Sequence, residues 1–107
     1  KKMSPAKLNA LLSESKFTSS TEVSSVNACQ LVVEAVFENL ALKQKIFRQL
    51  ETVVSPRTVL VSNTSTLSVD LISAVLQNPS RCAGMHFFSP AHVMQLVEIV
   101  KGSESSP

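Results

Sequence analysis

Two short apolar runs, separated by a segment with helical spacing, constrain the fold of this chain more than any other feature. The runs cover residues 31–36 and 58–62 and are rich in Val and Leu. Runs that are almost continuously apolar are typical of strands in a parallel sheet covered on both faces. Between them, apolar residues recur at helical spacing over 42–53, after Asn39, which can cap a helix. This order predicts an α/β protein with right-handed crossovers.

The rest of the chain continues the same alternation. The other predicted elements are a helix from Pro5, a β-prone stretch at 16–21, a loop with a helical turn at 19–27, a helix from Ser68 to Asn78, and strands at 82–88 and 95–100. The full order is helix, strand, helix, strand, helix, strand, strand. It indicates a mostly parallel sheet with flanking helices.

The composition excludes several classes of function. The chain has 107 residues, of which 44% are hydrophobic, as expected for one small domain or part of one. A net charge of +2, with scattered basic residues and no Tyr or Trp, argues against nucleic-acid binding. No apolar run is long enough to span a bilayer, and no signal peptide is visible. We therefore expect neither nucleic acid nor membrane as a partner.

Cysteine and glycine are both scarce. Cys29 and Cys82 lack CxxC spacing, which predicts small buried residues in a reducing compartment. Gly84 and Gly102 are the only glycines. A complete nucleotide-binding α/β domain needs a Gly-rich first turn, and this sequence has none.

His86 and Glu98 are the first candidate catalytic residues. His86 lies at the end of one predicted strand and Glu98 lies within the next. A lone His beside an apolar run is usually structural, but a buried Glu is rare unless it is paired. A carboxylate on a neighbouring strand could hydrogen-bond one imidazole nitrogen and leave the other for a substrate proton. The two residues together predict proton transfer.

Polar residues also follow the first two predicted strands, where ligands bind in an open parallel sheet. Asn63 and Ser65 follow the second strand, although the local sequence favours ordinary turn and capping roles for them. Glu38 follows the first strand as a favourable neighbour of a helix N-terminus, and Lys43 has the pattern of a solvated residue. Glu34, inside the first strand, is either paired or turned toward the edge of the sheet, and we assign it no role.

The histidines do not form a metal-binding pattern. His86, His92 and Glu98 are separated by six residues each, which does not place two His on one helical face as HExxH does. Pro90 also interrupts the segment. We expect no metal and an exposed His92.

Four motifs together resemble the NAD-binding domain of L-3-hydroxyacyl-CoA dehydrogenases. They are Leu-Val-Val-Glu-Ala-Val-Phe-Glu-Asn at 31–39, Ser-Asn-Thr-Ser at 62–65, Gly-Met-His-Phe-Phe-Ser-Pro at 84–90 and Leu-Val-Glu-Ile-Val at 96–100. Their order and spacing match the family, and four linked motifs are more specific than any one. The resemblance begins near Leu8 and implies a Rossmann-like domain.

The resemblance implies oxidation of an L-3-hydroxyacyl-CoA to a 3-ketoacyl-CoA in fatty-acid β-oxidation. In that reaction His86 would be the general base, and Glu98 would orient it and stabilise the imidazolium. Ser65 would bind the substrate by a hydrogen bond to its 3-oxygen. NAD would accept the hydride from C3.

The resemblance also implies a set of contacts to NAD. Glu38 and Asn63 would lie near the nicotinamide and its ribose, and Lys43 would be a further contact. The backbone of Ala35 and Val36 would pass beside the cofactor.

The sequence departs from the family pattern in two ways. Many members have Asn where this chain has Ser89, so we assign Ser89 no role. The Gly-rich first βαβ unit is missing, as is the all-helical C-terminal domain that in the family supplies a catalytic Asn, much of the acyl-CoA site and the dimer surface. We therefore expect residues 1–107 to be the second half of an NAD-binding domain that is inactive alone.

The motif around residues 87–94 is similar to the peroxisomal-type bifunctional enzymes, which add an enoyl-CoA hydratase module. This similarity favours a peroxisomal parent protein that forms a homodimer or is fused to such a module. The mitochondrial matrix and the cytoplasm are the alternative locations.

Two other interpretations stay open. Related 3-hydroxy acid dehydrogenases, including lens-crystallin relatives that oxidise sugar acids, share the His and Glu framework but typically replace the Asn-Thr-Ser and Phe-Phe motifs. A truncated gene product that keeps the fold for binding or assembly only would explain the missing Gly-rich turn. The sequence keeps every side chain that the dehydrogenase reaction needs from this part of the domain. This favours the dehydrogenase interpretation.

Overall fold

The structure, a computed structural model, describes residues 2–14 and 17–107. Its elements are α1 (Pro5–Ser13), the 3₁₀ helix η1 (Val23–Val26), β1 (Leu31–Glu34), α2 (Leu40–Val53), β2 (Val59–Ser62), α3 (Val69–Ser73), the 3₁₀ helix η2 (Pro79–Arg81), β3 (Cys82–Phe87) and β4 (Val97–Lys101). Among the described helices, none is long and apolar enough to cross a membrane.

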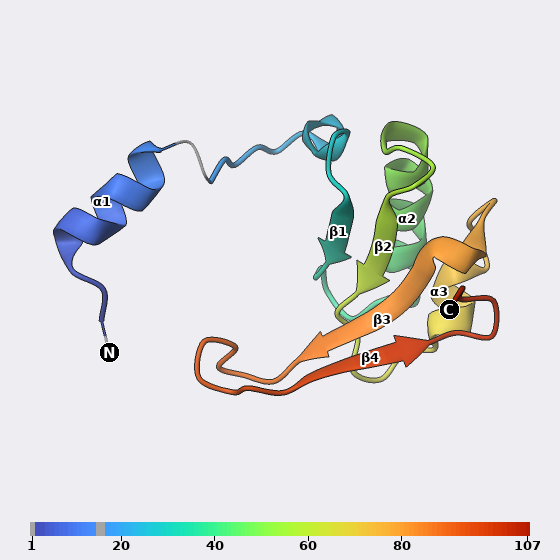
Figure 1. Cartoon of the computed structure of the whole chain (residues 1–107). Helices are drawn as coiled ribbons and strands as arrows, with labels where there is room; N and C mark the ends of the chain where they lie inside the picture. Colours follow the sequence, from blue (N-terminus) through green and yellow to red (C-terminus); the bar gives the residue numbers. More distant parts are fainter. Residues whose placement is uncertain (1, 15–16) are drawn as a thin grey trace.

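The four strands form one sheet in the order β1-β2-β3-β4 (Figure 1). β1, β2 and β3 are parallel, because α2 and α3 return the chain to the same end of the sheet each time. β4 follows β3 without an intervening helix and therefore pairs with it antiparallel. This arrangement confirms the predicted mostly parallel sheet with flanking helices.

The hydrophobic core lies between α2, α3 and one face of the sheet. Phe47 of α2, Leu60 of β2 and Ile72 of α3 have no exposed surface. The helical spacing of apolar residues in α2 places Phe47 and Leu50 on this buried side. The core therefore holds the parallel strands in position at the end where the predicted site residues lie.

The opposite face of the sheet is apolar and mostly exposed, although Val61 of β2 is buried. Leu31, Val33 and Val59 are between 41% and 46% exposed, and Ile99 is 59% exposed. Leu31 pairs with Val59 across β1 and β2, so their side chains share this face. The prediction that the strands are covered on both faces is therefore wrong for the described residues, whose helices cover one face only.

The predicted caps are confirmed. Asn39 Oδ1 accepts a hydrogen bond from Leu42 N–H at 3.0 Å, and Ser68 Oγ accepts one from Leu71 N–H at 3.4 Å. Asn39 thereby fixes where α2 begins, directly after the loop that follows β1. Ser68 does the same for α3 after the loop that follows β2.

The third helix is shorter than predicted. The sequence predicts a helix up to Asn78, but α3 ends at Ser73, whose hydroxyl donates to the Asp70 carbonyl and competes with the helical backbone. Asn78 instead caps η2 by accepting a hydrogen bond from Ser80 N–H at 3.3 Å. The chain therefore enters β3 from a 3₁₀ turn.

The N-terminal segment lies apart from the core. α1 begins as predicted, with Ser4 as its cap and Pro5 in its first turn, but it has no buried residue and lies away from the sheet in Figure 1. The predicted β-prone stretch begins at residue 16, which lies outside the described residues. Residues 17–21 form no strand, so this prediction is wrong over the part that is described.

Candidate functional site

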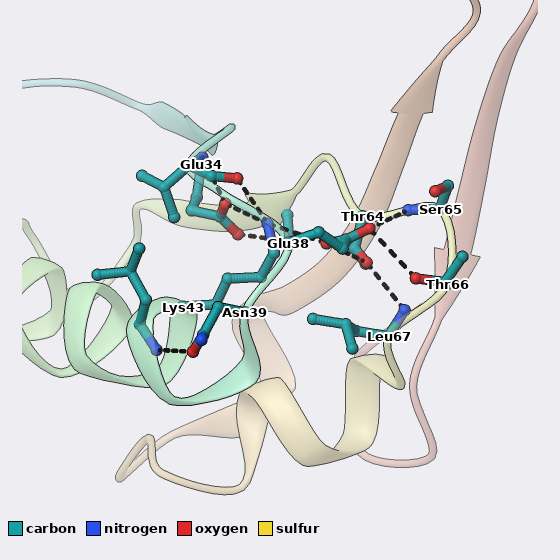
Figure 2. Close-up of polar contacts among 11 residues, drawn as sticks. Glu34, Glu38, Asn39, Lys43, Thr64, Ser65, Thr66 and Leu67 are labelled. Atoms are coloured by element: carbon teal, nitrogen blue, oxygen red, sulfur yellow. Dashed lines mark hydrogen bonds and ion pairs between the residues drawn. The ribbon is translucent and has the colours of Figure 1, made fainter.

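Polar residues from several elements gather where the parallel strands end. The loop at 35–39 follows β1, the loop at 63–68 follows β2, and His86 lies near the end of β3. Figure 2 shows the side chains of the first two loops directed toward one another. In open parallel sheets this end of the strands is where ligands bind, so these loops form the candidate site.

His86 and Glu98 face each other across β3 and β4. They are paired in the antiparallel register, so both side chains lie on the same face of the sheet. Nδ1 of His86 is 3.6 Å from Oε1 of Glu98, and the two side chains are 25% and 54% exposed. The predicted proximity of the two residues is confirmed. The ring of Phe88 packs against His86, with ring centroids 5.0 Å apart.

Glu38 joins the loop after β1 to the loop after β2. Its carboxylate accepts hydrogen bonds from Thr64 Oγ1 at 2.9 Å and from Ser65 N–H at 3.2 Å, with Thr66 Oγ1 at 3.4 Å. Figure 2 shows these contacts around one carboxylate. Burial alone would raise the pKa of Glu38, but the hydrogen bonds from Ser65 and Thr64 and the nearby Lys43 ammonium hold it below its ordinary value of 4.5.

Asn63 ties the end of β2 to its two neighbouring strands. Its backbone N–H donates to the Glu34 carbonyl at 2.8 Å. Its side-chain Oδ1 accepts a hydrogen bond from Phe87 N–H at 3.2 Å, one residue beyond His86. Asn63 thus connects all three parallel strands at the site.

Ser65 is exposed, and its hydroxyl is carried on the same loop. Among the described residues no hydrogen bond joins Ser65 to His86. Ala35 is also exposed and lines a hollow of about 260 Å³ along β1, between η1 and α2. His86 and Ser65 are not part of this hollow.

Glu34 and Lys43 form a buried ion pair that the sequence did not predict. Lys43 Nζ lies 2.6 Å from Glu34 Oε2, and the side chains are 1% and 0% exposed. The interpretation of Lys43 as a solvated residue is therefore wrong, and of the two possibilities for Glu34 the paired one holds. The signal was present, since a Glu inside an apolar strand needs a partner and Lys43 is the first cation of the next helix.

The arrangement suits proton transfer next to a bound ligand. The Glu98 carboxylate faces the His86 imidazole, so a proton accepted by His86 would have an opposite charge beside it. Glu38 is partly exposed and Ala35 is exposed at the same end of the sheet, next to Asn63. Within the described residues, no group of three His, Cys, Asp or Glu side chains could hold a metal ion.

A family model and individual relatives all point to the same protein family. The family model described as "3-hydroxyacyl-CoA dehydrogenase, NAD binding domain" matches residues 1–107. A peroxisomal bifunctional enzyme from Danio rerio is 59% identical over 76 residues, which cover 71% of this chain and 11% of that protein. A 3-hydroxyadipyl-CoA dehydrogenase from Escherichia coli is 40% identical over 109 residues, covering 91% of this chain and 23% of that protein.

Solved structures agree with the sequence comparison. The dehydrogenase part of multifunctional enzyme 1 from C. elegans superposes with a TM-score of 0.83 at 36% identity, covering 97% of this chain and 24% of that one. A 3-hydroxybutyryl-CoA dehydrogenase from Escherichia coli superposes with a TM-score of 0.80 at 39% identity, covering 94% of this chain and 24% of that one. These matches confirm the Rossmann-like fold. The chain spans between about a tenth and a quarter of the length of these relatives.

Proposed function

Because this chain belongs to the 3-hydroxyacyl-CoA dehydrogenase family, as part of its NAD-binding domain, we propose that it serves the NAD-dependent oxidation of L-3-hydroxyacyl-CoA to 3-ketoacyl-CoA in fatty-acid oxidation. The observation that carries this proposal is the register pairing of His86 with Glu98 at the ligand-binding end of the sheet. A base is needed there because the substrate hydroxyl must lose a proton as its carbon is oxidised.

His86 is the proposed general base. Its Nδ1 faces the Glu98 carboxylate, which leaves Nε2 free to take the proton from the 3-hydroxyl of the substrate. Glu98 stabilises the resulting imidazolium by its negative charge and holds the ring in position. Ser65, on an exposed loop, is the proposed hydrogen-bond donor to the 3-oxygen of the substrate.

Glu38, Asn63 and the Ala35 backbone are the proposed contacts to NAD, which when bound supplies the hydride acceptor. Their placement at the carboxyl ends of β1 and β2 fits the nicotinamide end of the cofactor. Lys43 is a further proposed contact to NAD, and its Nζ lies 3.3 Å from Glu38 Oε1. With two glycines and no Gly-rich turn, these residues do not fit the pyrophosphate, which needs backbone N–H groups from such a turn.

We propose that residues 1–107 are the second half of a larger NAD-binding domain and are inactive alone. The exposed apolar face formed by Leu31, Val33 and Val59 supports this, because parallel sheets are stable when both faces are covered. β1 also lies at an edge of the sheet, with one side unpaired among the described residues. A preceding βαβ unit would supply both the missing cover and the Gly-rich turn.

The similarity to peroxisomal bifunctional enzymes supports a peroxisomal parent protein with an enoyl-CoA hydratase module. Such a parent would both hydrate an enoyl-CoA and oxidise the product. An assay of the natural protein for both reactions tests this module, and size-exclusion chromatography tests whether the protein is a homodimer.

The substrate class is tested with the natural full-length protein that carries this chain. We expect NADH to form from an L-3-hydroxyacyl-CoA and not from its D isomer, because one base on one side of the carbon selects one configuration. The free 3-hydroxy acid without CoA serves as a second comparison. Equal oxidation of the free acid would contradict the acyl-CoA assignment and favour a related 3-hydroxy acid dehydrogenase.

A further inference from the structure

Glu34 is the centre of a buried hydrogen-bond cluster beneath the candidate site. Its carboxylate accepts from the Ser62 hydroxyl, from Val36 N–H at 2.9 Å and from Lys43 Nζ at 2.6 Å. The three donors belong to three different parts of the chain, namely β2, the loop after β1, and α2. A single side chain therefore fixes these three segments relative to one another.

Lys43 connects this buried cluster to the candidate site. Its ammonium has three protons, and three protein acceptors surround it: Glu34 Oε2 at 2.6 Å, the Val36 carbonyl at 3.3 Å and Glu38 Oε1 at 3.3 Å. The side chain is 1% exposed. Lys43 thus donates hydrogen bonds to Glu34 and to the Val36 carbonyl, and it forms an ion pair with one oxygen of Glu38.

Glu38 then fixes the loop that carries the substrate and cofactor groups. It accepts hydrogen bonds from Thr64, Ser65 and Thr66, and it is the one partly exposed carboxylate of the cluster, with 38% of its side chain accessible. Figure 2 shows the whole series, from Glu34 through Lys43 and Glu38 to this loop. A displacement of Glu34 would therefore be transmitted to Ser65 over two ionic contacts.

A gain in fold stability does not explain the buried ion pair of Glu34 and Lys43. Moving two charges out of water costs about as much free energy as their attraction returns, and an apolar pair of similar volume is often as stable. What the ion pair provides, and an apolar pair would not, is directional contact to Val36 and Glu38. The cluster is therefore suited to setting geometry.

We propose that Glu34 is a positioning residue for NAD, which through Lys43 holds the loops at 35–38 and 63–66 so that Glu38 and Asn63 meet the nicotinamide end of the cofactor. This inference rests on the proposed function, since it concerns the same site. Glu34 is fully buried and does not touch the cofactor. It acts by keeping the residues that do in one arrangement before the ligand binds.

The test compares two glutamates in the natural full-length protein. Glu34→Gln keeps the size of the side chain and removes the charge that holds Lys43. Glu51→Gln is the matched control, because Glu51 lies on α2 and accepts hydrogen bonds from Gln77 and Asn78 N–H at 2.8 and 3.2 Å, outside the site. The dissociation constant of NADH, kcat, KM for NAD and the melting temperature are measured for each variant.

We expect both variants to lower the melting temperature and only Glu34→Gln to weaken NADH binding, by about tenfold to 100-fold, as loss of a supporting contact does elsewhere. KM for NAD should rise with it. An unchanged NADH dissociation constant in Glu34→Gln would overturn the inference. If Glu34→Gln does not fold, Ser62→Ala, which removes one hydrogen bond from the same carboxylate, takes its place with the same two outcomes.

A double variant separates positioning from general loss of structure. Because Glu34 and Lys43 act as one unit, Glu34→Gln combined with Lys43→Met should bind NADH no more weakly than the worse single variant. Additive losses would contradict the proposal. A wild-type protein that neither binds NADH nor turns over would refute the proposed function, whereas an active wild type with an unaffected Glu34→Gln would refute this inference alone.

Discussion

The Glu38 carboxylate accepts a hydrogen bond from the backbone N–H of Ser65 at 3.2 Å, which ties the loop after β1 to the loop after β2. The two residues are far apart in sequence, and neither loop has regular structure of its own. The geometry of the candidate site therefore depends on a charged side chain as well as on the sheet beneath it.

Protonation of Glu38 should loosen this connection. Its pKa in the folded chain is below the ordinary value of 4.5, so its stabilising effect is fully present above that pH and is lost as the pH falls through the lower folded-state value. We expect the melting temperature of Glu38→Gln to lie below that of the wild type at pH 7. The difference should shrink as the pH approaches 3. A difference that is constant from pH 7 to pH 3 would show that the charge of Glu38 does not stabilise the fold.

The two cysteines should differ sharply in reactivity. Burial raises the pKa of the Cys82 thiol to about 12, and the nearby Glu34 carboxylate acts in the same direction, whereas Cys29 is exposed. The prediction that the cysteines are buried is therefore confirmed for Cys82 and wrong for Cys29. Since the thiolate is the reactive form, iodoacetamide at pH 8 should label Cys29 in the native protein and Cys82 only after unfolding. Peptide mapping measures both sites, with Cys29→Ser as the control. Rapid native labelling of Cys82 would show that it is accessible.

Two neighbouring residues of α3 should respond very differently to truncation. Ile72 is fully buried in the core and Leu71 is 53% exposed. We expect Ile72→Ala to lower the free energy of unfolding by about 2–5 kcal/mol. Leu71→Ala should change it by about 0.5 kcal/mol or less. Urea denaturation measures both, and similar losses would mean that α3 does not pack on the sheet as described.

Gly84 should not tolerate a side chain. A Cβ at this position would lie 3.1 Å from Val69 Cγ2 on α3 and 3.2 Å from Val100 Cβ on β4, which is closer than ordinary packing. Gly84→Ala should therefore lower the free energy of unfolding by about 1–3 kcal/mol. Adding Val69→Ala makes room for the new methyl group and should restore part of the loss. If Val69→Ala does not restore any stability to Gly84→Ala, the strain arises from a contact other than the one with Val69.

Much of the fold could be predicted because its signals are local. The apolar runs, the cap at Asn39 and the cap at Ser68 each depend on a few adjacent residues, and each was confirmed. The pairing of His86 with Glu98 could also be predicted, since consecutive strands without an intervening helix commonly pair. The end of α3 is not predicted because the Ser73 hydroxyl donates to the Asp70 carbonyl, which spacing alone does not reveal.

The supporting part of the site could not be predicted from local patterns. Lys43 has the sequence pattern of a solvated residue, and its burial depends on how closely α2 packs against β1. The partners of Glu38 lie on a loop that follows a different strand. The sequence motifs identify the candidate residues, but the contacts that hold them in place follow from tertiary packing.

The central claim is that His86 transfers the substrate proton. We would measure kcat for oxidation of an L-3-hydroxyacyl-CoA by the natural full-length protein, beside His86→Gln and beside His92→Gln, which changes an exposed histidine outside the site. The account predicts that His86→Gln loses about two to four orders of magnitude in kcat while it still binds NADH, and that His92→Gln is unchanged. A His86→Gln variant that turns over at the wild-type rate would contradict it.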